Sequence, residues 1–150
     1  MQTRIKVEEH EGDLALGIIL SDQMLYNRVF YASDLSVEPT VPQKLMFLDC
    51  SKKILACTSR NVAKTVGIRA RITKFMSTYL PKGAKQNEEA LVFAPDEGHL
   101  TPLINRLFED ISRMKLLKSM VTRQRSGDKP EVVLKTGLTL FGRLEGSSGT

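Results

Sequence analysis

A chain of 150 residues with 41% hydrophobic and 26% charged side chains has the composition of a globular protein with a buried core. Two cysteines in this length argue against a secreted fold held by disulfides, and the longest apolar run, Leu14 to Leu20, is much shorter than the ~20 residues that cross a bilayer. We therefore expect a cytoplasmic protein without a membrane partner, with a single globular domain over 1–146 and a flexible tail over 147–150.

The net charge of +5 is divided unevenly along the chain. Residues 1–49 carry four basic and eight acidic side chains, residues 50–87 carry nine basic and no acidic side chains, and residues 88–150 carry nine of each. An uncompensated positive block of this kind favours a polyanion or an acidic protein surface as the partner.

The first third of the chain gives weak structural signals. Alternation predicts a short strand over 3–9, and the apolar run over 14–20 fits a strand or a helix equally well. Helical spacing predicts a helix over 21–35 with Ser21 as its N-cap, followed by an extended connection over 36–43 that contains two prolines.

Residues 44–59 contain two runs of four apolar residues on either side of a polar segment, Cys50 to Lys53. This pattern fits either a hairpin of two buried strands or one helix, and we favour the hairpin because each run has the length of a buried strand.

The clearest helix is predicted over about 60–80. Its apolar residues recur at helical spacing and form one stripe, and Pro81 ends it. Ser59 or Asn61 can cap its first turn. The residues of the stripe are Ile68, Ile72, Phe75, Met76 and Tyr79.

The last part of the chain predicts strands around a second long helix. A strand is expected over 90–95, a helix over about 101–124 with Thr101 at the N-cap and Pro102 at the first position, and two strands over 131–146 separated by Lys135 to Gly137. The fold class expected is α+β: a small mixed domain with two long amphipathic helices packed on short strands, which we expect to be antiparallel.

Four cations share one narrow face of the helix predicted over 60–80. At about 100° per residue, Arg60, Lys64, Arg71 and Lys74 fall within an arc of about 80°, displaced from the apolar stripe. Like charges at i and i+4 repel by ~0.2–0.5 kcal/mol, so mixed signs would make a solvated face at lower cost. A phosphate backbone can use such a row, because each neutralised phosphate releases condensed counterion.

The sequence therefore predicts a non-catalytic nucleic-acid-binding protein. The turn before the helix adds Lys52 and Lys53, and Arg123 and Arg125 assist, although cations near a helix carboxyl end also complement its dipole. Duplex DNA or structured RNA is the expected partner, since aromatic side chains that would stack on single-stranded bases are scarce.

The alternative is a protein-assembly or adaptor module. Its basic helix would dock on the acidic surface of a partner or on the acidic first third of a second copy. Arg69 lies at the edge of the apolar stripe, where its stem either reaches out to water or holds the charge against a fixed partner or a phosphate.

No complete metal or cofactor motif is found, and we expect neither. Cys50 and Cys57 have the wrong spacing for a zinc knuckle, and the two histidines are not paired with other ligands. Asp96, Glu97 and His99 follow a predicted strand, where catalytic loops often lie, but a polar loop leading into the next helix explains them equally well. An enzyme is therefore the less favoured class.

Overall fold

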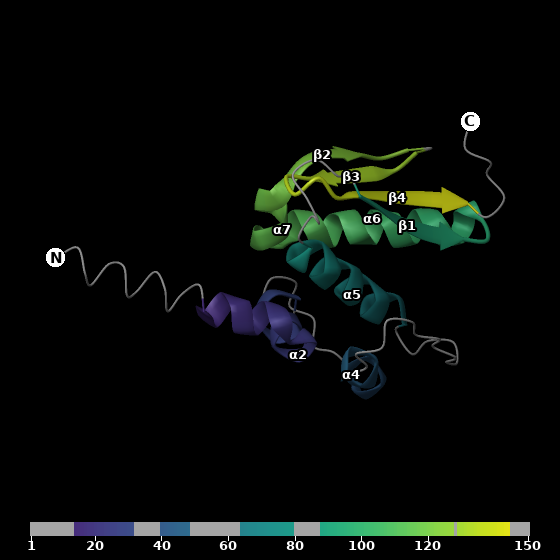
Figure 1. Cartoon of the computed structure of the whole chain (residues 1–150). Coiled ribbons are helices and arrows are strands. Elements are labelled where there is room, and N and C mark those ends of the chain that lie inside the picture. The colour runs from purple at the N-terminus through teal and green to yellow at the C-terminus, as the bar shows by residue number, and fades with distance from the viewer. Residues whose placement is uncertain (1–13, 32–39, 49–63, 80–87, 128, 145–150) are drawn as a thin grey trace. The chain divides into compact units, whose positions relative to one another are not determined.

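The computed structural model describes residues 14–31, 40–48, 64–79, 88–127 and 129–144 (Figure 1). The chain divides into two compact units, Met1–Lys74 and Phe75–Thr150, and the boundary falls inside helix α5. The single domain predicted over 1–146 stays a prediction. Residues 3–9, the second strand of the predicted hairpin and the tail lie outside the described residues.

Helices fill the described part of the first unit. The apolar run that fitted either structure is a helix over residues 14–21. Asp22 then starts a new helix, because its side chain accepts hydrogen bonds from the backbone N–H groups of Met24 (2.7 Å) and Leu25 (2.9 Å). Helix α2 (Gln23–Tyr26) continues into a π-helix, η1 (Asn27–Tyr31). The helix predicted over 21–35 thus has Asp22, not Ser21, as its N-cap.

The first strand of the predicted hairpin is wrong, because its residues lie in helix α4 (Val41–Leu48). Thr40 and Gln43 stand three residues apart, and the Gln43 side-chain oxygen accepts the backbone N–H of Thr40 at 2.6 Å. This contact is half of a capping box, and Pro42 suits the first turn of a helix. These local signals decide for a helix, because four apolar residues in a row fit either structure.

Helix α5 (Lys64–Thr78) confirms the helix predicted over 60–80 for the part that the structure describes. Its buried face differs from the predicted stripe: Ala70, Thr73 and Met76 are buried, whereas Ile68 and Phe75 are exposed. In the first unit, α4 approaches at Gly67, where Met46 Sδ lies 3.3 Å from the position a Cβ would take. The small residues Gly67, Ala70 and Thr73 are all buried on this side of the helix.

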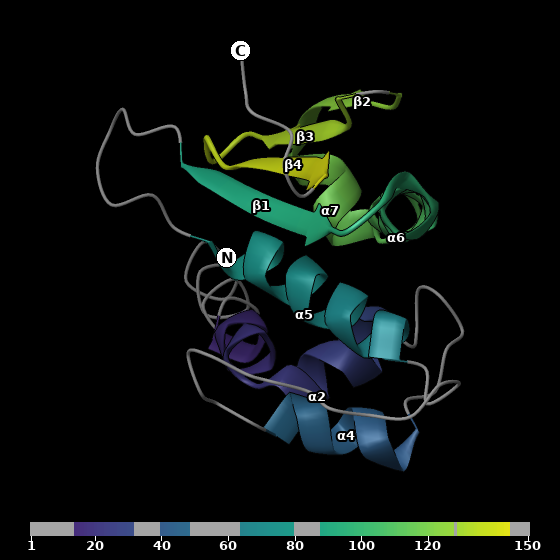
Figure 2. The ribbon, with the colours of Figure 1, turned by 90° about the vertical axis from the view of Figure 1, so that its right-hand side faces the viewer.

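The second unit contains a four-stranded sheet whose strands lie in the order β1-β4-β3-β2 (Figure 2). The strands are β1 (Glu89–Ala94), β2 (Val121–Arg125), β3 (Glu131–Leu134) and β4 (Thr139–Leu144). Short turns join β2, β3 and β4, which pair antiparallel as expected, but β1 pairs parallel with β4 because helices connect it to the rest. The predicted α+β class is confirmed.

Helix α6 (Glu97–Arg113) packs on β1 and β4. It starts four residues before the helix predicted over 101–124, because Asp96, not Thr101, supplies the N-cap. Buried Met114 leaves helical geometry, α7 (Lys115–Met120) follows, and the last predicted helical residues form β2 instead. The core between α6 and the sheet contains Leu100, Ile104, Leu107, Phe108, Ile111, Val132, Leu134 and Leu140.

Candidate nucleic-acid interface

Two of the predicted phosphate-binding cations on α5 hydrogen-bond to backbone carbonyls at helix ends. Arg71 Nη1 donates to the carbonyl oxygen of Met46 at 2.6 Å, and Lys74 Nζ donates to that of Ser21 at 3.1 Å. Met46 lies in the last turn of α4, and Ser21 ends the helix over 14–21. The last carbonyls of a helix have no intrahelical donor and carry partial negative charge. These two cations therefore complement helix carboxyl ends inside the first unit.

The other predicted phosphate contacts around α5 are Lys64 and three residues that the structure does not describe. Lys64 is the first residue of α5 and is half-buried, and Arg60, Lys52 and Lys53 lie outside the described residues. Phosphate contact by these four residues stays a prediction.

Arg69 is held in the interior of the first unit. The residue is 8% exposed, and its Nη2 donates to the hydroxyl of Tyr31 at 3.2 Å. Of the alternatives left open for Arg69, the structure shows a buried cation with a fixed partner.

Replacing Arg71 by methionine is expected to lower the free energy of unfolding by about 1–2 kcal/mol, because the Met46 carbonyl loses a charged donor. We expect nucleic-acid affinity to stay unchanged. Arg71→Lys keeps the charge and one donor and should recover part of the lost stability. Urea unfolding and a binding titration on the full chain measure both quantities. Lower affinity at unchanged stability would instead assign Arg71 to the phosphate contact.

The sheet of the second unit has an inner and an outer face. Side chains alternate between the faces of a strand, and Val92, Val132 and Leu140 point toward α6. The register then assigns their neighbours to the outer face. The outer residues are Glu89, Leu91, Phe93, Arg123, Arg125, Glu131, Val133, Thr139, Phe141 and Arg143.

Cations and aromatic rings gather at one end of this outer face. Phe93 is opposite Arg143, and the Arg143 guanidinium carbon lies 5.8 Å from the centre of the Phe141 ring. The β3–β4 ladder continues beyond its last pair through a hydrogen bond from Gly142 N–H to the Pro130 carbonyl (3.1 Å), which puts exposed Lys129 opposite Arg143. The basic–aromatic patch, as we call it below, consists of Phe93, Phe141, Arg125, Lys129 and Arg143.

Two carboxylates share the outer face without cancelling the charge of the basic–aromatic patch. Glu131 is 15% exposed and bonds to Arg123, with 3.0 Å between Oε1 and Nη2. Glu89 begins β1, beside Thr139 and away from Arg143. The end of the sheet that holds Arg125, Lys129 and Arg143 is therefore positive.

The sequence prediction named Arg125 but missed Lys129, Arg143 and the aromatic part of this patch. Phe93 is 60% exposed and its neighbour Leu91 is 46% exposed. The available signal was the alternation in β1 and β4, where the small residues Ala94 and Gly142 share the inner face with Val92 and Leu140 and so leave both phenylalanines outside.

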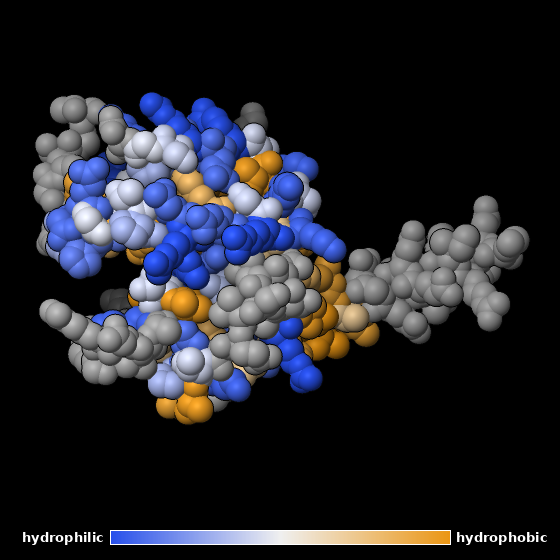
Figure 3. Space-filling model, turned by 180° about the vertical axis from the view of Figure 1, so that it is seen from behind, coloured by the Kyte–Doolittle hydropathy of each residue, from blue (hydrophilic) through white to orange (hydrophobic). Residues whose placement is uncertain are grey.

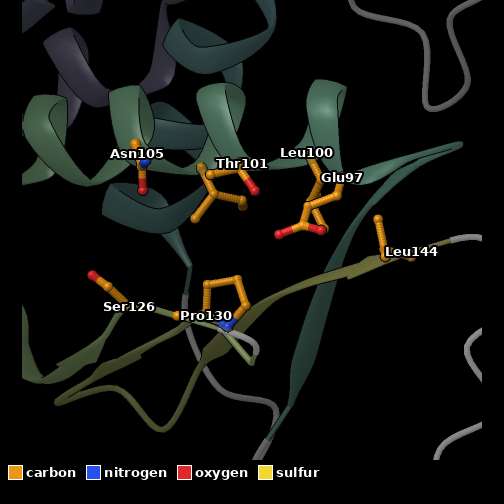
Figure 4. A pocket seen from close by; sticks show the side chains of 9 residues that line it. Glu97, Leu100, Thr101, Asn105, Ser126, Pro130 and Leu144 are labelled. Atoms are coloured by element: carbon orange, nitrogen blue, oxygen red, sulfur yellow. The ribbon is translucent and has the colours of Figure 1, made fainter.

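A cleft of about 480 Å³ lies between α6 and the end of the β2–β3 hairpin (Figure 4). Glu97, Thr101 and Asn105 project from successive turns of α6 toward Ser126 and Pro130. The only ionisable group among its lining residues is the Glu97 carboxylate, so the cleft repels phosphate. Leu100, Ile104, Gly127 and Leu144 complete its lining.

Asp96 and His99 do not join Glu97 in this cleft. Asp96 caps α6: its Oδ1 accepts the His99 backbone N–H at 2.9 Å, and both carboxylate oxygens lie 2.8 Å from His99 Nδ1. The hydrogen bond from the His99 side chain, and then the one from its backbone, lower the pKa of the Asp96 carboxyl below its ordinary value. The His99 side chain is 73% exposed, so this pair explains the start of the helix and not a catalytic site.

The described residues form neither a metal-binding cluster nor a membrane-spanning helix. Among the described residues, no cluster of three or more histidine, cysteine or acidic side chains is placed to hold a metal ion. In the same part of the chain, no helix has the length and apolar character needed to cross a bilayer. No protein-family model, curated protein or solved structure matches this chain.

Proposed function

We propose that this chain is a non-catalytic, cytoplasmic nucleic-acid-binding protein, and that the basic–aromatic patch of the second unit contacts the phosphate backbone, while Arg123 beside it bonds to Glu131. The observation that carries the proposal is the convergence of Arg125, Lys129 and Arg143 on one end of an exposed sheet face. Strands β2 and β4 and the turn between β2 and β3 hold these cations, so little backbone ordering is needed when phosphates bind.

Each phosphate that such a cation neutralises releases condensed counterion, which favours binding and makes it depend on salt. Contacts of this kind position the polymer without reading its sequence. The patch suits this role better than the described cations of α5, because Arg71 and Lys74 already hydrogen-bond to carbonyls within the first unit.

Charge reversal tests the proposal. Arg125→Glu combined with Arg143→Glu is expected to weaken binding to every sequence by at least about tenfold, and to reduce the slope of log K against log salt by roughly 1.5–2, since two phosphate contacts are lost. Fluorescence anisotropy with labelled oligonucleotides at several salt concentrations measures both.

The matched control is Arg106→Glu combined with Lys118→Glu. Both residues are exposed, and they lie on α6 and α7 instead of the outer face of the sheet. The control makes the same change in net charge, so an equal loss of affinity in both variants would show that total charge, and not the patch, determines binding.

A protein-assembly module is the second candidate, favoured by apolar side chains at the surface of the first unit. Leu14 and Ile18 are exposed one turn apart on the helix over 14–21, where Figure 3 shows apolar surface beside the amino-terminal trace, and Val41 and Leu45 are exposed one turn apart on α4. Light scattering on nuclease-treated protein tests self-association: a monomer at every salt concentration removes a second copy of the chain as the partner.

A further inference from the structure

We infer that the basic–aromatic patch takes single-stranded nucleic acid, with unpaired bases stacked on Phe93 and Phe141. The inference rests on the proposed function and names the form of polymer that the site accepts. The sequence favoured a duplex because few aromatic side chains were expected to be exposed for stacking on single-stranded bases. The structure removes that reason, since Phe93 is 60% exposed on the outer face and Phe141 is half-buried on the adjacent strand.

The two rings are diagonal neighbours on one surface. Phe93 pairs with Arg143 and Leu91 pairs with Phe141, so Phe93 and Phe141 are two residues apart in register on adjacent strands. With about 4.8 Å between strands and a rise of about 6.6 Å over two residues, their backbone positions are about 8 Å apart, within reach of consecutive bases that have been spread out. Stacking of a base on an aromatic side chain contributes ~1–3 kcal/mol, and every base has a face that can stack.

Guanidinium groups stand beside the rings. Arg143 lies over Phe141 with 5.8 Å between the guanidinium carbon and the ring centre, and Arg125 follows across β3 in the same row as Phe141. A planar guanidinium binds phosphate through two parallel hydrogen bonds. Glu131 of β3 lies between Phe141 and Arg125 in that row, where it is 15% exposed and bonds to Arg123. A strand of nucleic acid that follows Phe93, Arg143 and Lys129 along the end of the sheet would meet a ring and two cations without crossing this carboxylate.

The width of the sheet argues against a duplex. Four strands span three spacings of about 4.8 Å, or about 14 Å before side chains are added, whereas the major groove is about 12 Å wide. This face cannot enter a groove, and a duplex lying across it would keep its bases stacked on one another and away from both rings.

A protein partner fits this face less well. The core of a protein interface is depleted of charge and stable interfaces bury about 800 Å² on each side. On this face the apolar residues Leu91, Phe93 and Phe141 are few, and Arg143 stands among them.

The test measures the affinity of the full chain for a labelled 15-nucleotide oligo(dT) and for a 15-base-pair duplex. Phe93→Leu combined with Phe141→Leu keeps the apolar character of both positions and removes the rings. We expect at least about tenfold weaker binding of the oligo(dT) and unchanged binding of the duplex. Phe93→Tyr combined with Phe141→Tyr keeps both rings and should retain affinity for the single strand.

Leu91→Ala is the matched control, since Leu91 occupies the same face of β1 without a ring. The affinity of this variant for the oligo(dT) should equal that of the unchanged chain. Circular dichroism on every variant checks that the fold is kept. Equal binding of the leucine variant and the unchanged chain would overturn the stacking inference, while the proposed function would still stand if charge reversal abolished binding. If the unchanged chain bound neither polymer, or only associated with itself, both would fall.

Discussion

Replacing Leu107 by alanine is expected to lower the free energy of unfolding of the second unit by about 3–4 kcal/mol. Leu107 has no exposed surface and lies in the middle of α6, among the residues that face the sheet. The truncated side chain loses its transfer free energy and leaves a cavity that the packed layers of helix and sheet cannot close.

The expected loss is large compared with the total stability of a small domain, typically 5–15 kcal/mol. Amide hydrogen exchange in β3 and β4 measures the change within the second unit. Leu91→Ala removes the same atoms from the exposed outer face and should cost less than about 1 kcal/mol. Similar losses at both positions would contradict the assignment of the inner face.

Adding a side chain at Gly142 is expected to destabilise the second unit by overpacking. Gly142 lies on the inner face of β4, where an added Cβ would lie 2.9 Å from Pro130 Cγ and 3.0 Å from Ile104 Cγ1. Both neighbours are held by a ring or by the core, so Gly142→Ala should cost about 1–3 kcal/mol.

A double-mutant cycle isolates the cause. Ile104→Ala removes the Cγ1 and Cδ1 atoms that an alanine at 142 would meet, so the two substitutions together should cost about 1 kcal/mol less than the sum of each alone. Gly17→Ala is the matched control: nothing lies within 4 Å of its added Cβ in the helix over 14–21, and the substitution should stabilise that helix. Strictly additive effects would show that contact with Ile104 is not the reason for glycine at 142.

Local sequence patterns predicted several helices and strands correctly. The strands predicted over 90–95 and 131–146 are confirmed as β1, β3 and β4. The turn between the last two is also confirmed, with Gly137 at φ 87°, where other residues are strained. The helix predicted over 60–80 is confirmed where the structure describes it, because apolar residues at helical spacing over many residues distinguish a helix from a strand.

Competing local signals explain the errors. Asp96 and Thr101 are both good N-caps, and only the structure shows that α6 starts at the first of them, with Pro102 inside the helix. Residues 121–125 continue a helical pattern from the residues before them, but pairing with β3 makes them a strand. Such pairing depends on residues far away in the chain, which no local pattern contains.

The sequence by itself determined the α+β class and the presence of a cationic block with no acid to offset it. Tertiary structure alone decided what the charges do. It directs Arg71 and Lys74 to helix carboxyl ends. It also brings Arg125 of β2, Lys129 of the β2–β3 turn and Arg143 of β4 onto one sheet face with Phe93 of β1 and Phe141 of β4. The reason is physical: a helix face follows from spacing within one segment, whereas a sheet face exists only once strands distant in sequence have paired in register.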